Sequence, residues 1–150
     1  MFKKILVPSD LREASLVAFK AAVELAQANQ AQLFLLNVHP EFMSKEEMEM
    51  LRVSAQKFIK EERDIAVNAK AVLAEMLKRS GGDKVEHQIL LREGNAREEI
   101  LGTAKELGCD LIIVTTTGRT RLAEHLHGSD SEQLVRDTQT PILVIPVLEK

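Results

Sequence analysis

The chain has 150 residues, of which 45% are hydrophobic, and it carries a formal net charge of −3 at pH 7. This length and hydrophobic content suffice for one buried core, so we expect a single domain over residues 1–150. The slightly acidic balance and the lack of Trp and Tyr argue against the basic, aromatic surface that binds nucleic acids, so no nucleic-acid partner is expected.

Cysteine usage and the first residues of the chain point to the cytoplasm. Cys109 is the only cysteine, so no intramolecular disulfide can form, as is typical of a reducing compartment. The first apolar run stops at Pro8 and is far too short for a signal peptide or a membrane span. We therefore expect a cytoplasmic protein without a membrane partner.

Short apolar runs alternate with longer segments of helical periodicity, which is typical of β-α-β units around a parallel sheet. We expect strands over residues 5–8, 31–38, 85–91, 110–114 and 142–147. Helices are expected over residues 14–29, 44–79, 95–107 and 132–137. Joined by right-handed crossovers, these elements predict an α/β fold with a doubly wound, five-stranded parallel sheet and helices on both faces.

The segment over residues 44–79 is the longest helical stretch. Ser44 and Glu47 form a capping-box pattern at its start, and no Gly or Pro follows until Gly81. Its middle, residues 60–64, is wholly charged, and we expect any kink or break there.

A candidate anion site follows the fourth expected strand. That strand leads to Gly118, and a helix restarts after Gly128 with Ser129 as N-cap and Glu132 completing a capping box. Free backbone N–H groups at a helix start, approached by glycines without Cβ atoms, favour phosphate. The pattern predicts binding of a nucleotide tail.

These residues resemble the universal stress protein family, whose nucleotide-binding members carry G-x-x-G, nine residues, then Gly followed by Ser or Thr. Gly118, nine residues and Gly128-Ser129 match the second half of that motif. The opening residues 3–10 and the closing residues 141–147 also look like this family, so the resemblance covers essentially the whole chain.

The resemblance implies a strand order of 3-2-1-4-5 and a cleft between the carboxyl ends of strands one and four. It also implies binding of ATP or AMP, with Mg²⁺ only alongside the nucleotide, and a homodimer formed through the C-terminal strand. No catalytic residues are implied, although slow ATP hydrolysis is compatible with such a cleft. The implied nucleotide-binding residues are Pro8, Ser9, Asp10, Val38, Gly94, Thr115, Gly118, Gly128, Ser129 and Asp130.

Two positions depart from the family pattern. Thr115 replaces the first glycine, and if its backbone needed a positive φ it would cost about 1–2 kcal/mol. Asp130 follows the Ser of the motif, and its carboxylate would compete with phosphate for the helix start. Two unit charges ~5 Å apart at an effective dielectric of ~20 repel by about 3 kcal/mol, so the carboxylate of Asp130 would oppose a phosphate. The replacements at both positions therefore predict weakened nucleotide binding.

Several of these residues also have an ordinary structural interpretation. Asp10 with Glu13 is a capping-box pattern, Val38 is a typical core residue, and Gly94 suits a turn. Thr115 has the β propensity of a strand end, and Cys109 suits a small core position. His125 and His127 have no third ligand marked nearby, so no metal site is expected.

Two functions from different classes remain open at this point. The first is a cytoplasmic adenine-nucleotide-binding stress or signalling protein. The alternative is a universal stress protein dimer that binds no nucleotide and acts as a protein-interaction module. Thr115 and Asp130 favour the alternative, while Gly118 and Gly128-Ser129 favour the nucleotide. A small hydrolase or transferase acting on a nucleotide is a third and weaker interpretation.

Overall fold

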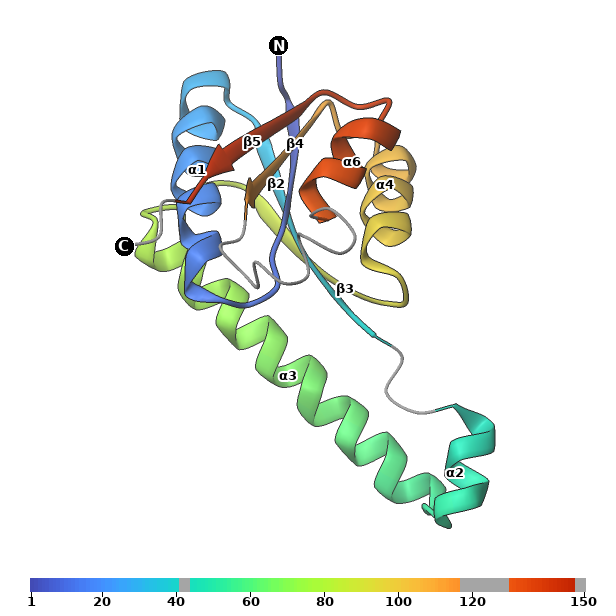
Figure 1. Ribbon diagram of the computed structural model, residues 1–150. Coiled ribbons are helices and arrows are strands. Elements are labelled where there is room, and N and C mark those ends of the chain that lie inside the picture. Colours follow the sequence, from blue (N-terminus) through green and yellow to red (C-terminus); the bar gives the residue numbers. More distant parts are fainter. Residues whose placement is uncertain (41–43, 117–129, 148–150) are drawn as a thin grey trace.

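The computed structural model describes residues 1–40, 44–116 and 130–147 (Figure 1). Five parallel strands form one sheet in the order β3-β2-β1-β4-β5. They are β1 (Lys4–Pro8), β2 (Gln32–His39), β3 (His87–Glu93), β4 (Leu111–Thr116) and β5 (Ile142–Pro146). The predicted α/β class and strand order are therefore confirmed.

The described helices include four that cover the two faces of this sheet and a short one that extends away from it. They are the short 3-10 helix η1 (Glu13–Ser15), α1 (Leu16–Asn29), α2 (Lys45–Leu51), α3 (Ala55–Arg79), α4 (Ala96–Leu107) and α6 (Asp130–Asp137). Helices α1 and α3 pack into one apolar core, and α4 and α6 pack into the other (Figure 1). Both faces are covered, which explains why the central strands read as continuous apolar runs.

The side chains of the central strands alternate between the two cores. Ile5 and Val7 of β1 lie in the core beneath α1 and α3, while Leu6 between them lies in the core beneath α4 and α6. Leu33 and Phe34 of β2 divide in the same way. This period of two fixes the register of each strand, because a slip by one residue would exchange the two faces.

The long helical segment after β2 is broken, but not where its charged middle predicted. Residues 60–64 lie inside the continuous helix α3, so the expected position of the break is wrong. The break follows α2, where Arg52 adopts a left-handed φ of 54°. Ser54 then caps α3 by accepting a hydrogen bond from the backbone N–H of Lys57 at 3.1 Å. An N-cap hydroxyl that satisfies an otherwise unpaired N–H decided the helix start.

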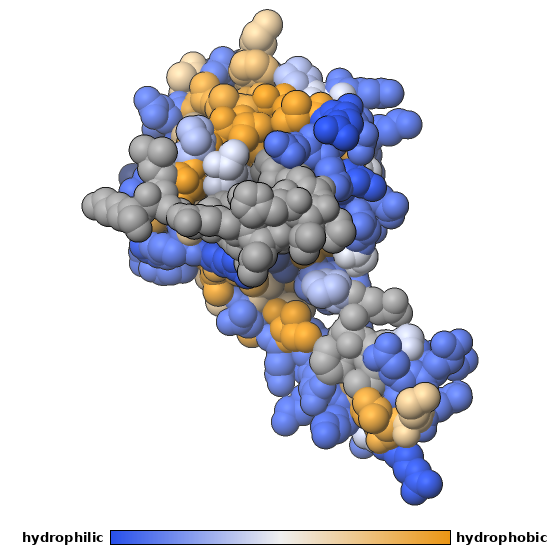
Figure 2. Space-filling model, in the orientation of Figure 1, coloured by the Kyte–Doolittle hydropathy of each residue, from blue (hydrophilic) through white to orange (hydrophobic). Residues whose placement is uncertain are grey.

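Only the carboxyl-terminal half of α3 packs on the sheet. Its buried residues begin at Ala69, and α2 has none. Helix α2 and the first turns of α3 extend away from the sheet (Figure 1). Figure 2 shows apolar surface at the α2 end of this projecting segment, where Met50 and Leu51 are exposed. The amino-terminal half of α3 therefore contributes no buried residue to a core, and it continues the half of the helix that packs on the sheet.

Candidate functional site

The sheet opens at the carboxyl ends of its central strands. Strand β1 pairs with β2 as far as Pro8 and Leu36, but it pairs with β4 only through Ile5–Leu111 and Leu6–Ile112. Strands β1 and β4 therefore part well before β4 ends at Thr116. This is the topological switch point of a doubly wound sheet, where such folds bind ligands.

A cleft of about 510 Å³, a size typical of small-molecule sites, lies on the β2 side of this point, and no described residue of β4 lines it. Three segments far apart in the sequence form it: the turn after β1, the end of β2 and one face of α3. Its lining residues are Asp10, Leu11, Asn37, Val38, His39, Pro40, Asp64, Ile65 and Asn68. The fold thus brings two of the predicted nucleotide-binding residues, Asp10 and Val38, to one cleft.

The backbone of Val38 faces the cleft. Alternate residues of a parallel strand direct their N–H and C=O groups to the same neighbour. Gln32 N donates to Lys3 O and Leu36 O accepts from Ser9 N, whereas His39 O accepts from Gly94 N on the β3 side. Val38 has the same place in this alternation as Gln32 and Leu36, so its backbone N–H and C=O are directed to the β1 side of the strand. Because β1 ends level with Leu36, the Val38 groups point past its end.

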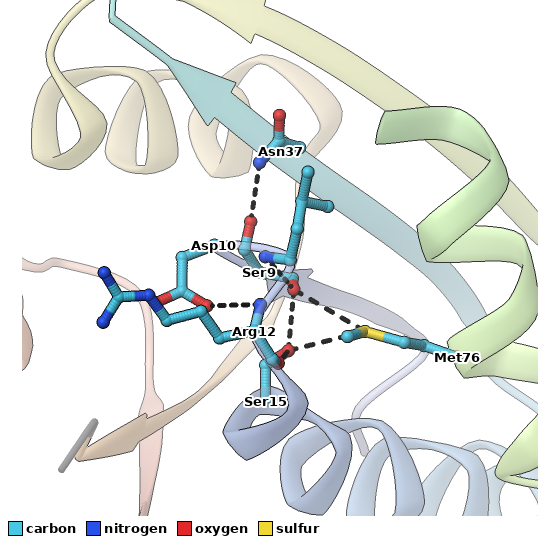
Figure 3. A network of polar contacts seen from close by, with 7 residues as sticks. Ser9, Asp10, Arg12, Ser15, Asn37 and Met76 are labelled. Carbon is cyan, nitrogen blue, oxygen red and sulfur yellow. Dashed lines mark hydrogen bonds and ion pairs between the residues drawn. The ribbon is translucent and has the colours of Figure 1, made fainter. Parts of the chain in front are cut away.

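The Ser9 side chain is buried, is not among the residues that line the cleft, and points toward Ser15 and Met76 (Figure 3). Its hydroxyl accepts a hydrogen bond from the backbone N–H of Leu11 at 3.0 Å and lies 2.7 Å from the hydroxyl of Ser15. The Sδ atom of Met76, on α3, lies 3.5 Å from the Ser15 Oγ and 3.9 Å from the Ser9 Oγ. The Ser9 side chain therefore organises the turn after β1, although the sequence predicted a nucleotide contact.

Asp10 shapes the same turn through a different contact. Its Oδ1 atom accepts a hydrogen bond from the backbone N–H of Arg12 at 3.0 Å, and Arg12 Nε lies 3.8 Å from its Oδ2 atom (Figure 3). The N-cap of η1 is Arg12, so the capping-box interpretation of Asp10 is wrong. Leu11 adopts a φ of 69°, a left-handed conformation that costs a non-glycine residue about 1–2 kcal/mol. The turn keeps the carboxylate of Asp10 at the cleft.

Asn37 ties the two central strands together at the cleft floor. Its side chain is buried, and its Nδ2 atom donates a hydrogen bond to the backbone O of Ser9 at 2.9 Å (Figure 3). Sequence reasoning missed this residue, although a lone amide inside an apolar strand was a usable signal. It fixes where the turn after β1 leaves the sheet.

The α3 residues of the cleft were also missed. Asp64, Ile65 and Asn68 lie on one face of the helix because residues four apart are neighbours. Their spacing was visible in the sequence, but nothing there showed that this face of α3 lies against the end of β2.

Gly94 lies in the turn after β3 and is not among the residues that line the cleft. It follows β3, adopts a φ of 135° and donates its N–H to the backbone O of His39 at 3.0 Å. A Cβ atom here would also lie 3.3 Å from the Oε1 atom of Glu99. The backbone conformation favours glycine, so the turn interpretation of Gly94 accounts for the residue type.

Two further predicted residues, Pro8 and Thr115, lie in the neighbouring strands β1 and β4. Pro8 is the last residue of β1, and Thr115 is a buried residue inside β4, paired in register with Ile145. The backbone of Thr115 is extended, with no positive φ, so the anticipated strain does not arise.

Of the last four predicted site residues, the structure describes only Asp130. Gly118, Gly128 and Ser129 lie outside the described residues. Asp130 begins α6, which therefore starts two residues earlier than predicted. Within residues 1–40, 44–116 and 130–147, no group of three His, Cys, Asp or Glu side chains could hold a metal ion. No helix of these segments is long and apolar enough to span a bilayer.

Comparison with known proteins supports this fold. Universal stress protein YxiE of Bacillus subtilis is 31% identical over 147 residues, which span 97% of this chain and 99% of the relative. The solved structure of protein MJ0577 superposes with a TM-score of 0.75 at 25% identity, over 100% of this chain and 99% of that chain. A universal stress protein crystallised in complex with cAMP superposes with a TM-score of 0.72 at 19% identity, over 97% of both chains.

The family model described as the universal stress protein family matches residues 1–146. This match, the 31% identical relative and the strand order show that the chain belongs to the universal stress protein family.

Proposed function

We propose that this protein is a cytoplasmic adenine-nucleotide-binding protein that uses the cleft between β1, β2 and α3. The observation that carries the proposal is the backbone of Val38, whose N–H and C=O point past the end of β1 into that cleft. A donor and an acceptor side by side on one residue complement N1 and the 6-amino group of adenine. A backbone pair of this kind makes these bonds whatever the side chain.

The cleft also has the size and composition that a nucleotide needs. Its volume of about 510 Å³ lies within the range of small-molecule sites. Leu11, Val38 and Ile65 supply apolar surface for a base, while Asp10 supplies a polar contact at the mouth. A protein similar in fold to this chain has been crystallised in complex with cAMP, which supports the proposal.

The proposed activity is binding, with signalling as its purpose. The side-chain hydroxyl of Ser9 is already engaged with Leu11 N and Ser15, and Asp10 with Arg12 N, so neither is poised as a nucleophile or base. Any Mg²⁺ would arrive with the nucleotide. We therefore propose slow turnover of ATP at most.

We also propose a homodimer formed through β5. This strand lies at one edge of the sheet, beyond β4, and its Leu143 side chain is exposed. An edge strand with unpaired backbone groups is a template for pairing with a second copy. Light scattering that reports a monomer at micromolar concentration would refute this part of the proposal.

The test is a calorimetric titration of AMP and ATP, with and without Mg²⁺, into protein first stripped of any co-purified nucleotide. We expect AMP to bind in the micromolar range. We also expect N6,N6-dimethyl-AMP to bind at least about tenfold more weakly, because it has lost both 6-amino protons, and one lost hydrogen bond corresponds to roughly that factor. No binding of AMP or ATP at millimolar concentration would refute the proposal and favour a protein-interaction module.

A further inference from the structure

Helix α3 contributes two polar side chains to the cleft that no part of the nucleotide motif includes. Asp64 and Asn68 lie one helical turn apart on the face of α3 that lines the cleft, on either side of the apolar Ile65. Among the residues that the structure describes, neither side chain has a hydrogen-bond or ion-pair partner. Both are therefore available to a ligand that occupies the cleft.

Asp64 and Val38 differ in the hydrogen bonds that they can make. An ionised carboxylate only accepts hydrogen bonds, whereas a backbone residue such as Val38 offers one donor and one acceptor. A 6-aminopurine has two amino protons at C6, so it can satisfy the Val38 C=O with one and a carboxylate with the other. A 6-oxopurine has an oxygen there, and two acceptors facing each other leave both groups without a hydrogen bond.

We propose that Asp64 selects 6-aminopurine nucleotides over 6-oxopurine nucleotides by accepting the second proton of the 6-amino group, with Asn68 beside it at the purine edge. This inference rests on the proposed nucleotide site and adds a specificity-determining residue to it. It differs from the Val38 contact because it can be removed by a side-chain substitution. It also explains why a carboxylate stands free on the cleft face of α3.

The expected size of the effect follows from the position of Asp64. Its side chain is exposed at the cleft mouth, so water screens it, and a contact of this kind contributes less than a buried one. We expect it to supply a factor of about 3 to 10 in the preference for AMP over IMP, since a tenfold ratio corresponds to one well-formed hydrogen bond.

The experiment measures the dissociation constants of AMP and IMP for the unchanged protein and for Asp64→Asn. The amide keeps the shape of the carboxylate but can donate to the C6 oxygen of IMP, so we expect IMP to bind more tightly and the AMP preference to fall about 3- to 10-fold. The matched control is Glu62→Gln, which makes the same change two residues away on α3, outside the cleft lining. It should leave the ratio unchanged.

Each outcome separates the two proposals. An AMP to IMP ratio that is the same in Asp64→Asn and in the unchanged protein, while AMP still binds, would overturn the role of Asp64 and leave the nucleotide site intact. Equal binding of AMP and IMP by the unchanged protein would also overturn the role of Asp64 and leave the nucleotide site intact. Absence of AMP binding would overturn the proposed function, and the inference with it. Circular dichroism of each variant establishes that the chain remains folded.

Discussion

The side-chain hydroxyls of Ser9 and Ser15 lie 2.7 Å apart in a buried contact that joins the end of β1 to the start of α1 (Figure 3). Ser15 donates its proton to the backbone O of Arg12 at 2.8 Å, so Ser9 is the donor between the two hydroxyls. Ser9 also accepts from Leu11 N, which leaves its hydroxyl fully engaged. The buried hydrogen bonds of Ser9 therefore stabilise the turn that places Asp10 at the cleft.

Replacing Ser15 by Ala should lower the free energy of unfolding by about 1–2 kcal/mol, because the buried Ser9 hydroxyl loses its acceptor. Urea denaturation of Ser9→Ala, Ser15→Ala and the double variant measures the coupling between the two groups. We expect the double variant to lose less stability than the sum of the single losses. Strictly additive losses would contradict the shared hydrogen bond.

The two halves of α3 should respond differently to truncation of an apolar side chain. Leu73 is fully buried, so Leu73→Ala should destabilise the protein by about 2–5 kcal/mol through lost burial and a new cavity. Ile59 is 53% exposed, so Ile59→Ala should change the stability by less than about 0.5 kcal/mol. Chemical denaturation of both variants makes the comparison. A large loss from Ile59→Ala would mean that the amino-terminal half of α3 is packed in solution.

The ion pair between Glu13 and Arg79 should make stability depend on pH. The side-chain hydrogen bond from Arg79 lowers the pKa of Glu13 below its ordinary value of 4.5. The stabilisation is therefore present above the unfolded pKa of 4.5 and is lost as the pH falls through the lower pKa of the folded state.

Stability curves of the unchanged protein and of Glu13→Gln should accordingly converge below pH 4.5. Added salt should reduce the difference between the two proteins above that pH, because both side chains are exposed. A difference that is constant across this pH range would argue against a contribution from this carboxylate.

Cys109 should react slowly with thiol reagents in the folded protein. Burial raises the pKa of its thiol from 9.0 to about 11, so the thiolate that reacts is scarce near neutral pH. We expect iodoacetamide to label the native protein far more slowly than the urea-unfolded protein, as followed by mass spectrometry. Equal rates would show that the carboxyl end of α4 opens readily.

The same shift implies a loss of stability at high pH. The unfolded chain releases the Cys109 proton near pH 9.0, while the folded chain keeps it up to about 11. The unfolded state therefore gains from ionisation first, and stability falls as the pH rises through this interval. Cys109→Ala should remove this component of the pH dependence.

Asp130 should weaken ATP binding more than AMP binding. It is the first residue of α6, and at a helix start a carboxylate and a phosphate chain would compete for the same N–H groups and dipole. Asp130→Asn should raise ATP affinity by about tenfold or less, the effect of roughly 1.4 kcal/mol of relieved repulsion, and AMP affinity by less. Asp137→Asn, at the other end of α6, is the control with the same change of charge. No difference between the two variants would show that Asp130 does not oppose the phosphates.

Local signals in the sequence predicted the local structure well. The cap of Ser44 is confirmed, because its side chain accepts a hydrogen bond from the N–H three residues on, and Asn95 caps α4 in the same way. The break at Arg52 was not predicted, because Ser54 caps a new helix there, and the capping-box interpretation of Asp10 was wrong, because its side chain accepts a hydrogen bond from the backbone N–H of Arg12 instead. Residues near one another in the chain compete for the same partners, and small energy differences decide between them.

The sequence by itself determined the alternation of strands and helices, the two-sided sheet and the family, since all of these depend on the periodicity and spacing of neighbouring residues. The family resemblance also marked Asp10 and Val38, which the fold brings to one cleft. Only the tertiary structure decided that Asp64 and Asn68 share the cleft and that the buried Ser9 side chain contacts Ser15. The lining of the cleft depends on how α3 packs across the sheet, and no short-range pattern encodes the distance between residues so far apart in the chain.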